Sequence, residues 1–210
     1  MAADRATRSV ELARLLEHPT IWRGISAAHS EVLPSGFDAL DACLPGGGWP
    51  RSGLIEILCH FGIGELTLLL PALAKLTQLP LARWCVWTAP PLEPFAPALA
   101  AHGVVLDRVL VVRGEVLWAF EQALGSGACE IAMAWMGQVR ARAIRRLQLA
   151  AERGRALGVL FRSRQAARES SHALLRMSLE PAAHGVRVTL LKSRGGRRGS
   201  IELTLPAIGS

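Results

Sequence analysis

The segment that comes closest to a chemical motif is 59–66, which reads CHFGIGEL and follows the apolar run LIEIL. In an α/β sheet, the turn after such a strand and the start of the next helix form a natural anion site. A phosphate-binding loop carries GxxxxGK[ST] there. Its glycines let backbone N–H groups surround phosphates, its lysine neutralises them, and its hydroxyl holds Mg²⁺. In this register Cys59 replaces the first glycine, and only the second glycine, Gly64, is kept.

The other replacements in this turn exclude ATP. Glu65 stands at the lysine position, and two like charges about 4 Å apart cost on the order of 4 kcal/mol at an effective dielectric constant of 20. Leu66 has no oxygen to offer magnesium, and Phe61 and Ile63 place bulk where the backbone must approach the phosphates. We therefore expect a degenerate, inactive phosphate loop without a nucleotide cofactor.

A second position that ATP chemistry requires is also missing. The strand-like run EIAMAW (130–135) should end in Asp if it polarised a magnesium-bound water, and it ends in Trp135. The six histidines have no neighbours at triad or metal-ligand spacing. The four cysteines form no CxxC pair and are typical of buried thiols in a reducing compartment. The sequence predicts neither an enzyme nor a metal site.

Apolar runs that alternate with helix-length segments surround this turn. They predict βαβ units and a mainly parallel sheet covered on both faces. Expected strands cover 54–58, 84–89, 108–112, 130–135 and 156–161, and expected helices cover about 65 onward, 94–102, 115–124 and 138–152. The closely spaced runs LLRMSLEP, GVRVTLLKSR and GSIELTLP predict antiparallel strands at the end, the last two joined as a hairpin.

The length of 210 residues and the apolar fraction of 50% fit one packed domain with a short appendage. We expect an N-terminal helix and lead-in segment over 1–30 and an α/β domain over 31–210. The start of the chain lacks the apolar core of a signal peptide. The longest apolar run, 66–74, is too short to span a bilayer and contains Pro71. A cytoplasmic protein without membrane contact is expected.

The formal net charge of +7 is unevenly distributed. Residues 139–200 hold 14 arginines and Lys192 against three glutamates, whereas residues 1–138 are slightly acidic. This asymmetry favours a polyanion or an acidic protein as partner. A codon bias toward Arg is the alternative, because only Lys75 and Lys192 are lysines.

Two basic groups are candidates for contact with DNA or with a partner. The first lies on the outer face of the expected helix 138–152, where DNA-backbone binding and a merely solvated face both remain open. The second lies at the hairpin tip, where clustered cations repel one another unless an anion is near. The two groups are Arg140, Arg142, Arg145 and Arg146, and Lys192, Arg194, Arg197 and Arg198. Trp22, Trp49 and Trp118 are either interface or core residues.

With these positions in view, the chain resembles RecA-type recombinase cores, and more closely the ImuA family. The stretch LPSGFDALDACLPGGGWPRSGLIEIL (33–58) is similar to the RecA-type entry segment, and GIGELTLLLPALA (62–74) to the degenerate loop of ImuA proteins. The resemblance covers roughly residues 20–206. It implies an α/β, RecA-like three-layer core whose mainly parallel central sheet finishes in antiparallel C-terminal strands.

The resemblance also implies a function. It suggests a non-catalytic accessory factor of SOS-induced translesion DNA synthesis and mutagenesis. Its expected partner is the ImuB-type inactive Y-family polymerase and, through it, an error-prone replicative-type polymerase subunit, with RecA and DNA as further candidates. In RecA-type proteins the region after the fourth strand lies near the DNA axis. The alternative is a SulA-type cell-division inhibitor that caps the division GTPase, since SulA proteins share this degenerate fold.

Overall fold

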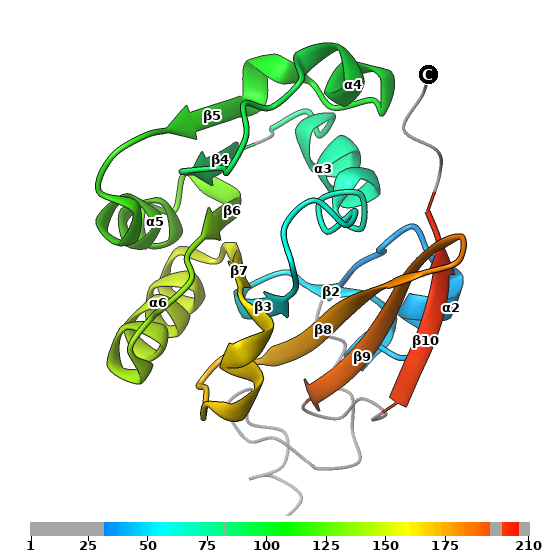
Figure 1. The fold of residues 1–210 in the computed structure, drawn as a ribbon. Coiled ribbons are helices and arrows are strands. Elements are labelled where there is room, and N and C mark those ends of the chain that lie inside the picture. Colours follow the sequence, from blue (N-terminus) through cyan, green and yellow to red (C-terminus); the bar gives the residue numbers. More distant parts are fainter. Residues whose placement is uncertain (1–31, 82, 194–198, 206–210) are drawn as a thin grey trace, which may run out of the picture. The chain divides into compact units, whose positions relative to one another are not determined.

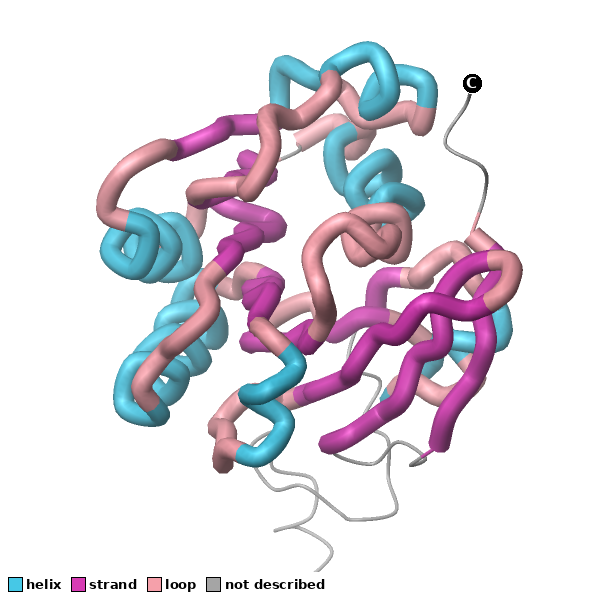
Figure 2. The backbone as a smooth tube through the Cα atoms, in the orientation of Figure 1, coloured by secondary structure: helices cyan, strands magenta, loops and turns pink. Residues whose placement is uncertain are grey.

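The computed structural model describes residues 32–81, 83–193 and 199–205, which all belong to one compact unit, residues 31–210 (Figures 1 and 2). The expected N-terminal helix, the lead-in segment and Trp22 lie outside the described residues. No helix in the part of the chain that the structure describes is both long enough and apolar enough to cross a membrane.

A central sheet organises this unit. Its strand order is β10-β9-β8-β3-β7-β6-β4-β5, and all neighbours from β8 to β5 are parallel. The strands β8, β9 and β10 pair antiparallel. The strands are β3 (Gly53–Leu58), β4 (Trp84–Thr88), β5 (Val109–Val112), β6 (Cys129–Trp135), β7 (Leu157–Arg162), β8 (Leu175–Ala182), β9 (Gly185–Ser193) and β10 (Gly199–Thr204). The predicted fold class is thus confirmed.

The central strands are buried along their whole length, which explains their nearly continuous apolar sequences. Every residue of β3 and β7 is buried, and the two strands pair in parallel from Gly53↔Leu157 to Leu58↔Arg162. Strands covered on both faces read as unbroken apolar runs and not as alternating ones. Glu56 and Arg162 are the charged exceptions in these two strands.

Helices cover both faces of the sheet (Figure 1). On one face, α5 and α6 pack against a cluster that includes Leu54, Phe120, Ile144 and Leu160. On the other face, α3 and the segment before β3 enclose a second cluster. The helices are α2 (Asp38–Asp41), α3 (Leu70–Thr77), α4 (Ala96–Ala101), α5 (Val116–Gly125) and α6 (Ala141–Gly154), with short 3-10 turns at Pro45–Gly47, Leu106–Arg108 and Arg164–Arg168. A separate two-stranded sheet joins β1 (Val32–Leu33) to β2 (Trp49–Pro50).

Two helix boundaries differ from the sequence-based expectation. The helix expected from about Glu65 begins at Leu70, after a series of turns. Pro71 lies at the first helical positions, where its missing N–H costs nothing, so α3 starts beside it. The Arg-rich helix expected over 138–152 begins later, at Ala141, and ends at Gly154.

The C-terminal hairpin pairs β9 with β10 from Leu190↔Gly199 to Gly185↔Thr204. The connecting residues 194–198 lie outside the described part of the chain, and with them Arg194, Arg197 and Arg198. Lys192 lies within β9, opposite Arg176 of β8, and not in the connecting turn.

Candidate functional site

The turn between β3 and α3 lies where a phosphate loop would lie, beyond the carboxyl end of a central parallel strand. Two glycines shape it, with φ angles of 88° at Gly62 and 99° at Gly64, a region that side chains rarely adopt. A Cβ at Gly64 would also lie 2.4 Å from the end of the Leu205 side chain, which would have to move to make room. The sequence therefore keeps the bends of a phosphate loop while losing its chemistry.

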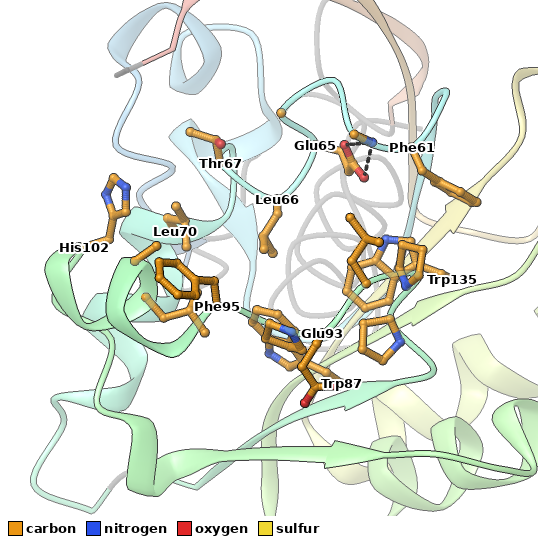
Figure 3. A pocket seen from close by; sticks show the side chains of 18 residues that line it. Phe61, Glu65, Leu66, Thr67, Leu70, Trp87, Glu93, Phe95, His102 and Trp135 are labelled. Atoms are coloured by element: carbon orange, nitrogen blue, oxygen red, sulfur yellow. Dashed lines mark hydrogen bonds between the residues drawn. The ribbon is translucent and has the colours of Figure 1, made fainter. Parts of the chain in front are cut away.

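Glu65 fills the anion position of this turn with its own carboxylate. Each carboxylate oxygen accepts a hydrogen bond of 3.0 Å from the Gly62 N–H, and Oε2 also accepts one of 3.1 Å from the Ile63 N–H (Figure 3). The residue is only 6% exposed. Backbone N–H groups that converge in a turn form a site for anions. Here that site is occupied from within, and a phosphate would meet a buried negative charge.

The buried thiol of Cys59 lies next to this turn, at the position of the first loop glycine. Burial, and then the negative charge of Glu65, raise the pKa of the Cys59 thiol to about 12. Such a thiol stays protonated at neutral pH and is a poor nucleophile. Cys59, Cys85 and Cys129 are buried, as the sequence suggested, whereas Cys43 is only partly buried.

The positions expected to hold magnesium are apolar. Leu66 is packed against the core and Trp135, at the end of β6, stacks on Phe161 with ring centroids 4.7 Å apart. Trp135 also lies 6.1 Å from the ring of Trp87. Within the described residues, no group of three or more His, Cys, Asp or Glu side chains could hold a metal ion.

A cavity of about 560 Å³ opens beside this turn, at the carboxyl ends of β3, β4 and β6 (Figure 3). We call it the aromatic cavity. It was not expected from the sequence, although the segment TAPPLEPFAP (88–97) supplies much of its wall. Its lining residues are Phe61, Gly62, Gly64, Glu65, Leu66, Thr67, Leu70, Trp87, Pro90, Pro91, Leu92, Glu93, Pro94, Phe95, Ala98, Leu99, His102 and Trp135.

The arginines of α6 lie on its outer surface, as its apolar spacing predicted. Arg140, Arg142 and Arg145 are exposed and have no ion-pair partner in the described part of the chain. Arg146 is different, because it pairs with Glu121 of α5. The opposite face of α6 buries Ile144, Leu147 and Ala150, among others. Of these four arginines, Arg140 at the N-cap of α6 and Arg142 and Arg145 within the helix are unpaired in the described part of the chain, and Arg146 is neutralised.

Lys192 of the second basic group is held by backbone. Its Nζ donates hydrogen bonds of 2.8 Å to the Ser171 carbonyl and 2.7 Å to the Ala173 carbonyl. It therefore fixes the segment before β8. The remaining residues of that group lie outside the described residues.

Of the candidate tryptophans, Trp49 is fully buried, whereas Trp118 on α5 is 62% exposed.

A buried ion-pair cluster, which sequence reasoning missed, crosses the central strands. Arg162 of β7 donates to Glu56 of β3 over 3.1 Å and to Glu169 over 2.8 Å. Arg176 of β8 approaches the other oxygen of Glu56, at 2.5 Å. Glu56 and Arg162 are completely buried. The available signal was a charged residue within each of two otherwise apolar strands, because buried charges must be paired.

Comparison with known proteins relates most of the chain to the bacterial protein ImuA and a shorter part of it to the bacterial protein SulA. The chain is 31% identical to Protein ImuA of Caulobacter vibrioides over 80% of its own length and 81% of that protein. It is 34% identical to Cell division inhibitor SulA of Edwardsiella piscicida over 59% of its length and 76% of that protein. The family described as "SulA: Cell division inhibitor SulA" matches residues 60–158. The chain belongs to the ImuA family, which is related to SulA.

Two further likenesses are narrower. Over 50 residues, 23% of this chain, it is 48% identical to Protein RecA of Francisella tularensis, but this stretch is only 14% of RecA. A crystal structure of SulA from Pseudomonas aeruginosa matches 52% of this chain and 97% of that one, with 27% identity and a TM-score of 0.44. Membership in the ImuA family thus rests on the comparison that covers 80% of this chain and 81% of the Caulobacter vibrioides protein.

Proposed function

We propose that this ImuA-family protein is a non-catalytic accessory factor of SOS-induced translesion DNA synthesis. It acts in the cytoplasm as a scaffold that binds other mutagenesis proteins. The observation that carries the proposal is the Glu65 carboxylate, which occupies the backbone donors of a RecA-like phosphate loop from within the chain. Because a side chain of the protein itself fills the nucleotide site, we infer that the protein acts by binding other proteins and not by hydrolysing ATP.

The partner that this proposal names first is the ImuB-type inactive Y-family polymerase, through which an error-prone replicative-type polymerase subunit is reached. RecA is a second partner. The family membership supports these assignments, because 81% of a protein named ImuA aligns with this chain. The test is calorimetric titration of the purified full-length chain with the ImuB-type protein of the same genome, alongside an ATPase assay. We expect a submicromolar complex and no ATP turnover above that of buffer; absence of a complex would refute the proposal.

DNA is proposed as a further ligand, contacted by the outer face of α6 and by the hairpin arginines. This assignment is supported by three cations that are unpaired in the described part of the chain, Arg140 at the N-cap of α6 and Arg142 and Arg145 within it, since phosphate contacts need accessible positive charge. A salt titration of single-stranded DNA binding tests it. Reversing Arg194, Arg197 and Arg198 together should lower the slope of log K against log salt by about 2, at ~0.7 per lost contact. The matched control reverses Arg108, Arg155 and Arg168 and should retain the slope.

A second candidate function is cell-division inhibition of the SulA type. Two observations favour it: the SulA family matches residues 60–158, and 76% of one SulA protein aligns at 34% identity. The two candidates differ in their target, so one assay separates them. Inhibition of polymerisation of the division GTPase by the purified chain would support the SulA-type function, whereas a stable ImuB-type complex without such inhibition supports the accessory function.

A further inference from the structure

The rim of the aromatic cavity carries apolar side chains that are exposed to solvent. Leu92 is 78% exposed, Phe95 70% and Phe61 44%, and all three line the same cavity. Inside, Trp87 and Trp135 provide two further aromatic walls. Burying such side chains against an apolar occupant removes their surface from water and is favourable. Apolar residues that gather around a hollow in this way mark binding sites.

The rim is also rigid. Pro90, Pro91 and Pro94 fix the backbone torsion at three of its positions and offer no N–H donors. A rim that does not need to be ordered on binding loses little entropy, which favours affinity. The cavity volume of about 560 Å³ lies inside the range of roughly 300–1,000 Å³ that is usual for ligand pockets. It can therefore receive a small number of apolar side chains.

The charges of the cavity exclude an anionic occupant. Among the described residues that line it, Glu65 and Glu93 are acidic, and no lysine or arginine is present. The Glu65 carboxylate is held by the Gly62 and Ile63 N–H groups and cannot move away without losing them. Glu93 lies at the rim, 72% exposed, in an ion pair with Arg113. The surroundings thus suit an apolar group flanked by positive charge.

The aromatic walls also carry unused donors. The indole N–H groups of Trp87 and Trp135 are buried and have no hydrogen-bond partner in the described part of the chain. Buried donors without partners are rare in folded proteins. Because these nitrogen atoms are buried behind the ring surfaces, they do not face an occupant of the cavity, and the rings offer it apolar contact.

We propose that the aromatic cavity binds an apolar segment of a partner protein, with a basic residue next to the apolar anchor. The proposal deepens the scaffold function and rests on it, because it assigns the surface on which a partner is held. It also gives the lost nucleotide site a use, since the cavity lies beside the turn that Glu65 has closed. The partner segment would bind beside the turn from which the Glu65 carboxylate repels phosphates.

The test uses the full-length protein and a dye-labelled peptide, acetyl-Gly-Arg-Leu-Phe-Leu-Gly-amide, followed by fluorescence anisotropy. One twin peptide carries Glu in place of Arg, and another carries Ser at the three apolar positions. We expect a Kd on the order of 10–100 µM for the basic peptide. The acidic twin should bind at least about tenfold more weakly, and the Ser twin should not bind. Equal binding of the acidic twin, or displacement of the peptide by ATP or adenosine, overturns the proposal.

Surface variants locate the binding. Leu92→Asp and Phe95→Asp change exposed residues of the rim, so they leave folding intact, which circular dichroism and Tm check. Each should weaken the basic peptide at least about tenfold. Leu81→Asp is the matched control, because Leu81 is 93% exposed and does not line the cavity. It should stay within about twofold of the parent protein, and rim variants that bind like this control overturn the proposal.

The outcome also separates this proposal from the scaffold function. An ImuB-type complex that forms while no peptide binds overturns the cavity assignment alone. Peptide binding that follows the expected pattern supports the cavity assignment even when no ImuB-type complex forms. The failure to form that complex refutes the proposed function alone.

Discussion

The carboxylate of Glu65 accepts hydrogen bonds of 3.0 Å from the backbone N–H of Gly62, at both of its oxygens. Gly62 has a positive φ, and the side chain of Glu65, three residues later, reaches back to the Gly62 N–H. The chain thereby supplies its own anion to a turn that would otherwise present N–H groups to phosphate. The turn therefore keeps the shape of a phosphate loop, and the Glu65 carboxylate takes up its backbone N–H donors.

Replacing Glu65 by alanine should destabilise the protein. The substitution leaves the Gly62 and Ile63 N–H groups without their acceptor, and we expect the free energy of unfolding to fall by about 1–2 kcal/mol. Urea titration measures it. Glu93→Ala is the control, because Glu93 lines the same cavity from an exposed position. A loss in the control equal to that of Glu65→Ala would contradict the structural role given to Glu65.

Glu65→Lys restores the charge of a phosphate loop, and we still expect no ATP binding. Leu66 offers no oxygen to magnesium, and Trp135 occupies the position of the metal-orienting carboxylate. Calorimetric titration with MgATP should show no saturable heat up to millimolar nucleotide, for this variant and for the parent alike. Micromolar binding of MgATP by the variant would mean that the negative charge of Glu65 alone prevents nucleotide binding in the parent protein.

The sequence predicted the fold well because its signals were local and repeated. Each central strand is an apolar run between helix-length segments, and the closely spaced strand-like runs at the end of the chain predicted the antiparallel strands. The start of α3 was misplaced because Gly62, Gly64 and Glu65 combine into turns through a side-chain contact, and no periodicity reveals such a contact. The negative charge that Glu65 brings to the turn could be read from the sequence, but the backbone partners of its carboxylate could not.

The site features that were missed depend on residues far apart in the chain. Glu56 and Arg162 meet only because β3 and β7 are neighbours in the sheet, 106 residues apart in sequence. The aromatic cavity needs three strand ends at once. Strand order is a property of the whole fold, so such contacts follow from the structure and not from spacing.

The buried pair between Arg162 and Glu56 should be sensitive to the loss of one partner. Arg162→Met removes one of the two arginines beside the buried Glu56 carboxylate and leaves Arg176 as its remaining partner. We therefore expect a loss of about 3 kcal/mol in the free energy of unfolding, at the lower end for a broken buried ion pair. Chemical denaturation measures it. Arg187→Met is the matched control, since Arg187 forms an exposed pair with Glu202 on β10, and its stability should stay within error of the parent. Equal effects of the two variants would contradict the assignment.

The cysteines should differ in reactivity. Burial is the main cause that raises the pKa of Cys59, Cys85 and Cys129 to about 12, from a usual value of 9.0. At pH 9 their thiolate fraction is then lower by a factor of about 10²–10³ than that of a free thiol. We expect a disulfide reagent to label Cys43 fast and the other three slowly, until denaturant exposes them. Cys43→Ser should remove the fast phase.

The same shifts give stability a pH dependence. The folded-state pKa of these thiols exceeds the unfolded-state value, so the unfolded chain releases its protons first as pH rises. Their contribution is therefore fully present below pH 9 and is lost progressively toward pH 12. Denaturation midpoints measured from pH 8 to pH 11 should fall. A midpoint that rises across this interval would contradict the burial of the thiols.

The unpaired arginines of α6 should carry more of any DNA binding than paired ones. Arg142 and Arg145 are exposed without an ion-pair partner in the described residues, whereas Arg146 is neutralised by Glu121. Reversing Arg142 and Arg145 to Glu should lower the salt slope of single-stranded DNA binding by about 1.4. Reversing Arg108 and Arg168, which lie outside α6, changes the net charge equally and should leave the slope unchanged. If both double variants lower the slope alike, the protein attracts DNA through its overall charge, and α6 is a solvated face of the fold.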